Sequence, residues 1–320
     1  TITDANLLLG RLNPTKLLAT ENAPSIDILR RAFESEIAIK LGIDADAAAG
    51  AVIRVANDRM AGAIRIVSIS KGHDPRDFTL FAFGGAGPLH AVALARELAI
   101  PRVLVPTRPG LTNALGCVVA DVRHDFVRTV NHPLDTVNIN DVREIMALQI
   151  KEGNDLIESE TISIEDIRVI HGADMQFVGQ THLISVPLPG LDTSREEIQE
   201  IFERAYFERF QVELPEIRAN LVNLKTSVIG VRPNFDLRRI TDVELRAKSL
   251  EGAQEGTRDV WFDGAWRETA IYIRDRLPIG ARFEGPAIVE QMDTTIVIEP
   301  ENLVEVDLDG NLSIEIGDAS

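Results

Sequence analysis

The first part of the chain shows apolar residues at helical spacing. Over residues 26–42 they recur every three or four positions, and Gly42 ends the predicted helix. A longer apolar stripe covers residues 49–67, with charged residues such as Arg54 and Arg65 lying off it. A stripe of this length predicts a helix that packs against a sheet or against another helix.

A change of pattern follows this second helix. The apolar run at residues 78–83 (FTLFAF) predicts a buried strand, and it leads directly into Gly84-Gly85-Ala86-Gly87. Pro88 suits the first position of a helix, where no backbone N–H is needed. A short apolar strand is predicted at residues 102–105 (RVLV). This order is a β-α-β crossover, which implies a parallel sheet covered by helices.

The character of the chain changes again after about residue 131. A helix is predicted over residues 140–150 and is expected to be interrupted near Gly153. Ser194 and Glu197 match a capping box, which opens another amphipathic helix. Strands are predicted in this region at residues 167–177, 181–186 and 221–231.

The C-terminal region is rich in short strand-like runs. From residue 260 onward these runs dominate, and Asp309-Gly310 is a strong signal for a hairpin turn. We therefore expect a β-rich module, either a small barrel or a sandwich. The predicted fold class is α/β, with a first domain over residues 1–130 and an α+β domain over residues 131–320.

Composition and charge narrow the class of protein. Apolar residues make up 45% and charged residues 26%, which is typical of a globular chain. A net charge of −17 would repel a phosphate backbone, so nucleic acid is excluded as a partner. Neither a membrane helix nor a signal peptide is recognised, and a cytoplasmic location is predicted. The single cysteine, Cys117, excludes an internal disulfide and is expected to be a buried, inert thiol.

The glycine-rich segment at residues 84–87 is the leading candidate for a binding site. Glycines after a strand allow a ligand to approach the backbone, and the following helix offers free N–H groups. The alternative is a tight strand-to-helix turn without a ligand. A dinucleotide motif is disfavoured because His90 stands where the third glycine should be, and a P-loop sequence is absent.

Three polar residues are further candidates for the site. His90, in the first turn after the glycines, either takes part in chemistry or packs at the start of the helix. Asp4 and Asn6 either hold Mg²⁺ or a polar ligand, or serve as caps and turn residues. The histidine spacing predicts no metal site. Thr1 as an N-terminal nucleophile is the weakest candidate.

Several of these segments together resemble the hydantoinase A/oxoprolinase family. The resemblance is dense over residues 3–128 and looser afterwards. It rests on Thr3-Asp4-Ala5-Asn6-Leu7, Asp74-Pro75-Arg76-Asp77-Phe78, FAFGGAGPLHA at residues 81–91, Ala120-Asp121-Val122-Arg123, Phe177-Val178-Gly179-Gln180 and Glu284-Gly285-Pro286-Ala287-Ile288.

The resemblance implies the C-terminal half of an actin-like (sugar kinase/heat-shock) ATPase domain, followed by an α+β, β-rich C-terminal domain. It assigns Gly84, Gly85, Ala86 and Gly87 to the adenosine of ATP, and it places Asp4 and Asn6 near the nucleotide cleft, with Mg²⁺ as the accompanying ion. Relatives use ATP to phosphorylate a cyclic amide such as hydantoin or 5-oxoproline, or a ketone in the carboxylase branch.

Two kinds of partner follow from the resemblance. One is a hydantoinase B-type subunit or domain, which completes the reaction. The other is the N-terminal half of the same protein, which in the family carries the glycine-rich phosphate loops that this sequence lacks. A chain without those loops is expected to be inactive alone. The competing hypothesis is therefore a non-catalytic module for subunit interaction.

Overall fold

The computed structural model describes residues 1–17, 25–214, 216–236 and 245–317. These residues form two units, each described by itself: Thr1–Gly116 with Asp236–Ser320, and Cys117–Phe235. The fold belongs to the mixed α/β class predicted from the sequence. The grouping differs from the predicted division at residue 130, because the β-rich C-terminal strands join the first unit instead of forming a module of their own.

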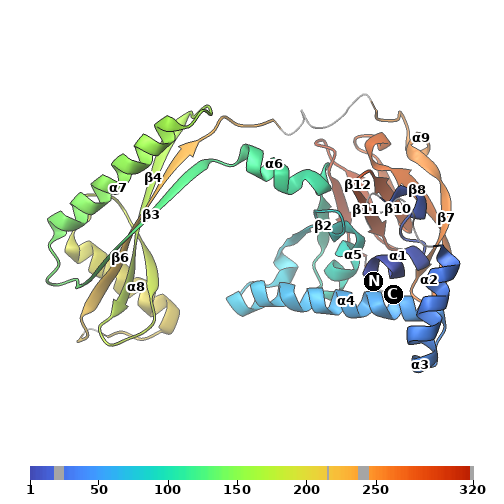
Figure 1. Ribbon diagram of the computed structural model, residues 1–320, viewed down its shortest axis with the longest axis horizontal. Helices are drawn as coiled ribbons and strands as arrows, with labels where there is room; N and C mark the ends of the chain where they lie inside the picture. Colours follow the sequence, from blue (N-terminus) through green and yellow to red (C-terminus); the bar gives the residue numbers. More distant parts are fainter. Residues whose placement is uncertain (18–24, 215, 237–244, 318–320) are drawn as a thin grey trace. The chain divides into compact units, whose positions relative to one another are not determined.

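The first unit contains a five-stranded sheet in the order β1-β2-β13-β12-β9. Its strands β2 and β12 are labelled in Figure 1. Its strands β1 and β2 are parallel and are joined by helix α5, so the predicted crossover is confirmed. β12 and β13 are antiparallel around the predicted turn at Asp309-Gly310, which is also confirmed. The strands are β1 Thr79–Phe81, β2 Arg102–Val105, β9 Arg282–Glu284, β12 Leu303–Val306 and β13 Leu312–Glu315.

A second sheet of the first unit has the order β11-β10-β8-β7. β10 is parallel to β8 and antiparallel to β11, and β7 and β8 form an antiparallel hairpin. Apolar residues of this sheet contribute to the same core as helix α5 and the first sheet, including Val289 and Ile296. The strands are β7 Gln254–Phe262, β8 Ala265–Ile273, β10 Ala287–Gln291 and β11 Thr294–Ile298.

The helices of this unit follow the predicted apolar spacing. The helix predicted at residues 26–42 forms, with a π-helical turn at Glu34–Ala38 between two α-helical pieces, and Gly42 ends it in the left-handed region. The helices are α1 Ile2–Leu8, α2 Ile26–Phe33, α3 Ile39–Leu41, α4 Ala45–Val67, α5 Gly87–Glu97 and α9 Leu250–Ala253; α6 Thr112–Val119 crosses the boundary between the units.

A buried arginine joins the distant parts of the first unit. The guanidinium of Arg274 donates to the carbonyls of Val105 and Pro106 at 3.3 Å and of Gly310 at 2.7 Å. Burial lowers the pKa of Arg274 to about 9. Because each carbonyl belongs to the end of β2 or to the β12–β13 turn, this side chain fixes the C-terminal hairpin against β2.

In its described residues, the second unit contains a four-stranded antiparallel sheet and two helices of its own, besides the end of α6. Its strand order is β3-β6-β4-β5, and its core combines side chains of the sheet with those of both helices, including Phe177, Phe202 and Tyr206. The elements are β3 Val122–Pro133, α7 Ile139–Ser159, β4 Asp166–Phe177, β5 Ile184–Leu188, α8 Arg195–Phe210 and β6 Ala219–Val231. The capping box of Ser194 and Glu197 is confirmed.

Two predictions for these helices were wrong. Helix α7 continues through Gly153. The glycine allows the helix to pack closely on β6, since an added Cβ would lie 2.3 Å from a methyl group of Val228. Cys117 is exposed rather than buried, because α6 contributes no buried side chain to a core. The prediction of a buried strand at residues 78–83 was also wrong, since β1 lies at the edge of its sheet and Phe81 is exposed.

Candidate functional site

The glycine-rich turn connects the end of β1 to the first residue of α5. Gly84 has a φ of +81°, a conformation that L side chains rarely adopt, and its N–H donates to the carbonyl of Pro109 at 2.7 Å. Pro88 is the second residue of α5, one position after the predicted first position, which Gly87 occupies. Gly85, Ala86 and Gly87 are exposed to solvent. The backbone of the turn is therefore fixed at its start and accessible along the rest.

One side of this turn packs against the connection between β10 and β11. The hydroxyl of Thr294 donates to the carbonyls of Gly84 and Gly85 at 3.3 and 3.0 Å. A Cβ added at Gly85 would lie 3.2 Å from the carbonyl oxygen of Asp293, whereas one added at Gly84 or Gly87 would meet nothing within 4 Å. The turn is thus occupied by protein on one side and open on the other.

A pocket of about 260 Å³ adjoins Gly85. Leu12, Leu89 and Met292 give it an apolar wall, and Thr3 and Lys16 add polar groups. The pocket is lined by Thr3, Leu12, Lys16, Leu17, Gly85, Leu89, Gln291, Met292, Asp293, Thr294 and Thr295. It therefore combines side chains from α1, from the segment after it, from α5 and from the β10–β11 connection.

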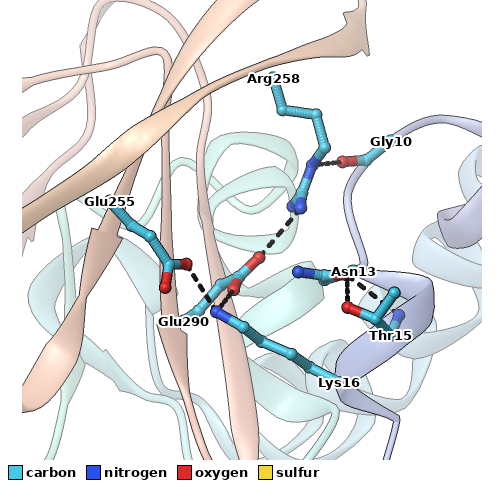
Figure 2. Close-up of polar contacts among 7 residues, drawn as sticks. All are labelled: Gly10, Asn13, Thr15, Lys16, Glu255, Arg258 and Glu290. Carbon is cyan, nitrogen blue, oxygen red and sulfur yellow. Dashed lines mark hydrogen bonds and ion pairs between the residues drawn. The ribbon is translucent and has the colours of Figure 1, made fainter.

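Lys16 is held by a network of charges at the side of this pocket (Figure 2). Its ammonium lies 2.6 Å from a carboxylate oxygen of Glu255 and 2.9 Å from one of Glu290. Arg258 pairs with the buried Glu290 at 3.0 Å and donates to the carbonyl of Gly10 at 2.8 Å. These contacts fasten the segment after α1 to strands β7 and β10, and they neutralise much of the charge of Lys16.

His90 does not reach the open side of the glycine-rich turn. It is buried, and its Nδ1 lies 2.8 Å from Oδ1 of Asn57 on α4. Burial lowers the pKa of His90, and the nearby charge of Arg11 lowers it further. A neutral imidazole that bonds to α4 fits the packing alternative for this residue.

Asp4 and Asn6 occupy local roles in α1. Asp4 completes a capping box with Thr1, whose hydroxyl accepts from the Asp4 N–H at 3.2 Å. Asn6 is buried, and its amide donates to the carbonyl of Ile2 at 3.1 Å. Neither side chain lines the pocket beside Gly85; Thr3 does. Helix α1 therefore borders the pocket through Thr3, which belongs to the segment at residues 3–7 that resembles the family but for which the sequence predicts no site role.

No group of three or more His, Cys, Asp or Glu side chains in residues 1–17, 25–214, 216–236 and 245–317 is arranged to hold a metal ion. Within the same part of the chain, no helix combines the length and apolar character needed to cross a membrane.

Comparison with family models identifies the class of protein to which this fold and turn belong. A model described as hydantoinase/oxoprolinase matches residues 1–126, and one described as hydantoinase/oxoprolinase C-terminal domain matches residues 140–314. The chain belongs to the hydantoinase/oxoprolinase family.

Individual relatives agree with this assignment over almost the whole chain. An uncharacterised protein of Methanocaldococcus jannaschii is 37% identical, over 98% of this chain and 44% of its own length. The caprolactamase subunit alpha of Pseudomonas jessenii is 31% identical, over 96% and 45%. The acetone carboxylase beta subunit of Xanthobacter autotrophicus is 27% identical, over 97% and 45%. The chain spans less than half the length of these relatives.

A solved structure shows the same fold. The ATP-dependent caprolactamase from Pseudomonas jessenii superposes with a TM-score of 0.77 at 28% identity, covering 99% of this chain and 47% of that chain. Both units of the present chain therefore have counterparts in an amide hydrolase that is described as dependent on ATP.

Proposed function

We propose that this chain supplies one wall of the ATP site in an ATP-dependent amide hydrolase. The observation that carries the proposal is the accessible turn at Gly84–Gly87, which borders a pocket with an apolar wall at the start of α5. A flat purine needs an apolar surface and a backbone free of side chains, and the turn and Leu89 offer both. The family assignment and the name of the solved relative support this reading.

The residues present fit the nucleoside part of ATP better than its phosphates. Leu12, Leu89 and Met292 line the pocket and would face the base. Gly85 also lines it, and the backbone of the turn from Gly85 to the neighbouring, exposed Gly87 would lie beside the ribose. Among the described residues that line the pocket, Lys16 is the cation, and two carboxylates already hold it. We therefore assign the phosphate and Mg²⁺ ligands to the additional polypeptide that the longer relatives possess.

The proposed reaction is hydrolysis of a cyclic amide, with the caprolactamase subunit alpha as the named relative. ATP would supply a phosphoryl group to the poorly reactive amide oxygen, with ADP as the leaving group; water would then add to the activated carbon, phosphate would leave with that oxygen, and the C–N bond of the ring would break. The residues of this chain would bind and orient the nucleoside and keep water from that end of the site. A hydantoinase B-type subunit is the proposed partner that completes hydrolysis.

Two alternatives remain as outcomes of the test. The relationship to the acetone carboxylase beta subunit favours a ketone as the activated substrate. The lack of phosphate loops in the sequence favours a non-catalytic module for subunit interaction, in which the turn has only a structural role. The substrate that stimulates ATP turnover separates the first alternative from amide hydrolysis, and a nucleotide-blocking substitution tests the second.

The test combines the chain with the additional polypeptide and a B-type subunit, and measures ATP turnover with hydantoin, 5-oxoproline, caprolactam and acetone. Gly87→Val places a branched side chain in open space at the turn, whereas Gly85→Val would also press on Asp293. We expect Gly87→Val to raise the KM for ATP by about tenfold, equivalent to about 1.4 kcal/mol of lost binding.

Gly256→Val is the matched control. This glycine also lies in the first unit, has open space around its Cβ position and stands in strand β7, where valine is well tolerated. The control should leave the KM for ATP unchanged. An unchanged KM for Gly87→Val in a folded protein would remove the turn from the nucleotide site, and stimulation by acetone alone would favour the carboxylase reading.

A further inference from the structure

A second polar pocket of the first unit is separate from the pocket beside Gly85. Its volume is about 420 Å³, and residues of α4, of α5, of the segment after α1 and of the hairpin of β7 and β8 line it. Among the described residues, none lines both pockets. Arg11 lines this pocket and the next residue, Leu12, lines the other, so the two are distinct candidate sites.

A buried arginine forms one wall of this second pocket. Arg11 is only 8% exposed, its Nη2 donates to the carbonyl of Trp261 at 3.5 Å, and its guanidinium carbon lies 5.7 Å from the centre of the Phe262 ring. No described residue accepts a hydrogen bond from its Nε. A buried donor without an acceptor is unfavourable, so this guanidinium suits a ligand that brings an acceptor into the pocket.

Two further donors face the same space from α4 and β7. Gly50 of α4 has no side chain, and a Cβ added there would lie 3.7 Å from Nε1 of Trp261 and 3.9 Å from Nη1 of Arg54. Both of these side chains line the pocket, and neither has an acceptor among the described residues. Guanidinium groups and indole N–H groups both donate to carboxylate oxygens, so the three donors together fit a carboxylate.

Four carboxylates also line the pocket, and two of them are already paired. Glu299 forms an ion pair with Arg96, and Glu97 lies 3.1 Å from an arginine at the end of α4. Asp58 on α4 and Asp263 in the turn between β7 and β8 have no cationic partner among the described residues. The charges that a ligand would meet are therefore those of two arginines and two aspartates.

This mixture of charges selects the class of ligand. A bare anion such as phosphate would gain from the arginines but would be repelled by the aspartates, and a bare cation would meet the reverse. A molecule with one carboxylate and one ammonium group satisfies both. We propose that this pocket binds a free amino acid, whose carboxylate is held by Arg11 and Arg54 and whose ammonium group faces Asp263.

The proposed function narrows the class further. Hydrolysis of a cyclic amide breaks the C–N bond of the ring and leaves a carboxylate and an amine on one molecule, which is an amino acid. The pocket would therefore hold the product of the proposed reaction at a site apart from the nucleotide. Only the choice of amino acid rests on the proposed function, because the class follows from the charges of the pocket.

Calorimetric titration of the whole chain, without nucleotide, tests the proposal. The probe is 6-aminohexanoate, the ring-opened form of caprolactam. Hexanoate lacks the ammonium group, hexylamine lacks the carboxylate, and inorganic phosphate carries negative charge alone. We expect saturable binding of 6-aminohexanoate with a Kd of about 1 mM or below, and binding of the other three that is weaker by about tenfold or more. Tryptophan fluorescence should change with the same Kd, because Trp261 lines the pocket.

Two substitutions and a matched control test the residues. Arg54 is exposed, so Arg54→Gln should leave the fold intact and weaken binding of 6-aminohexanoate by about tenfold or more. Arg59→Gln changes an exposed arginine of the same helix that does not line the pocket, and it should have no effect. Asp263→Asn should weaken binding of 6-aminohexanoate but not of hexanoate, and asparagine tolerates the φ of +47° at this position.

Three results would overturn the proposal. They are a lack of saturable binding of 6-aminohexanoate to the folded chain, phosphate binding as tight as that of 6-aminohexanoate, and equal loss of binding in the Arg54→Gln and Arg59→Gln variants. Circular dichroism shows whether each variant is folded. Because ATP is absent, failure here is distinct from failure of the nucleotide proposal, which is judged by the effect of Gly87→Val on the KM for ATP.

Discussion

The two units solve the same problem, the covering of a sheet, in different ways. In the second unit, strand β5 alternates buried and exposed residues, and Phe177, Phe202 and Tyr206 close a core between sheet and helix. In the first unit, β1 is apolar on both faces, yet Phe81 remains exposed. An apolar strand in the sequence therefore predicts that the strand is buried, but it does not identify the polypeptide that buries it.

The largest expected difference between the units is in the free energy of unfolding when one phenylalanine of each is truncated to alanine. Phe202 is fully buried, with its ring centroid 4.9 Å from that of Phe177, so Phe202→Ala should cost about 3–5 kcal/mol of unfolding free energy. Phe81→Ala removes a half-exposed ring and should change that free energy by no more than about 0.5 kcal/mol. Urea unfolding followed by circular dichroism measures both.

The two tryptophans provide an internal control for this test. Trp261 and Trp266 both lie in the first unit, so their fluorescence reports unfolding of that unit. Phe202→Ala should shift the transition seen by circular dichroism while the fluorescence transition stays in place. If both transitions move together, the units unfold as one and the contrast between them does not hold for stability.

Two glycines within long helices give the next largest effect. A Cβ at Gly153 would lie 2.3 Å from a methyl group of Val228, whereas a Cβ at Gly62 of α4 would meet nothing within 4 Å. Gly153→Ala should therefore destabilise the second unit by about 1–3 kcal/mol through overpacking. Gly62→Ala should stabilise the first by about 0.5–1 kcal/mol, because alanine is the better helix former.

The sign of the change in unfolding free energy at each glycine decides this prediction, and thermal and urea unfolding measure it. Opposite signs at Gly153 and Gly62 would confirm that the first is retained for packing against β6 and the second is not. Destabilisation at both positions would contradict this contrast, because a Cβ added at Gly62 meets no described atom within 4 Å.

Local patterns account for the parts of the fold that could be predicted. The stripe in α4, the crossover through α5 and the turn at Gly310 each depend on residues close together in sequence, so spacing alone identifies them. The pairing of β13 with β2 joins segments about two hundred positions apart. No periodicity encodes such a pairing, and the predicted boundary at residue 130 therefore separated strands that belong to one sheet.

The candidate site likewise combines residues that local sequence patterns predict with residues that only long-range contacts bring there. The turn at Gly84 was found because a strand, glycines and a proline stand in order. Thr294, the first residue of β11, bonds to the turn, and Met292 lines the pocket beside it. Lys16 also lines the pocket and pairs with Glu290. These residues carry no local signal of their role, whereas His90 carried a signal by position and is bonded to α4 instead.

The smallest expected effect concerns two buried histidines, one in each unit. Burial lowers the pKa of His90 and of His171, with the charge of Arg11 as a further cause at His90. The unfolded chain, with a histidine pKa of about 6.5, therefore binds a proton before the folded chain does as the pH falls. Stability is full above that value and decreases as the pH falls through it toward the lower folded pKa.

Replacing each histidine by glutamine should remove this dependence in its own unit. His90→Gln should flatten the loss of stability on acidification that tryptophan fluorescence reports for the first unit. His171→Gln should do so only for the transition seen by circular dichroism, since His171 bonds to Thr226 within the second unit. Unfolding midpoints measured between pH 5 and pH 8 test this prediction. If the midpoint of the first unit still falls on acidification in the His90→Gln variant, another group controls the acid response of that unit.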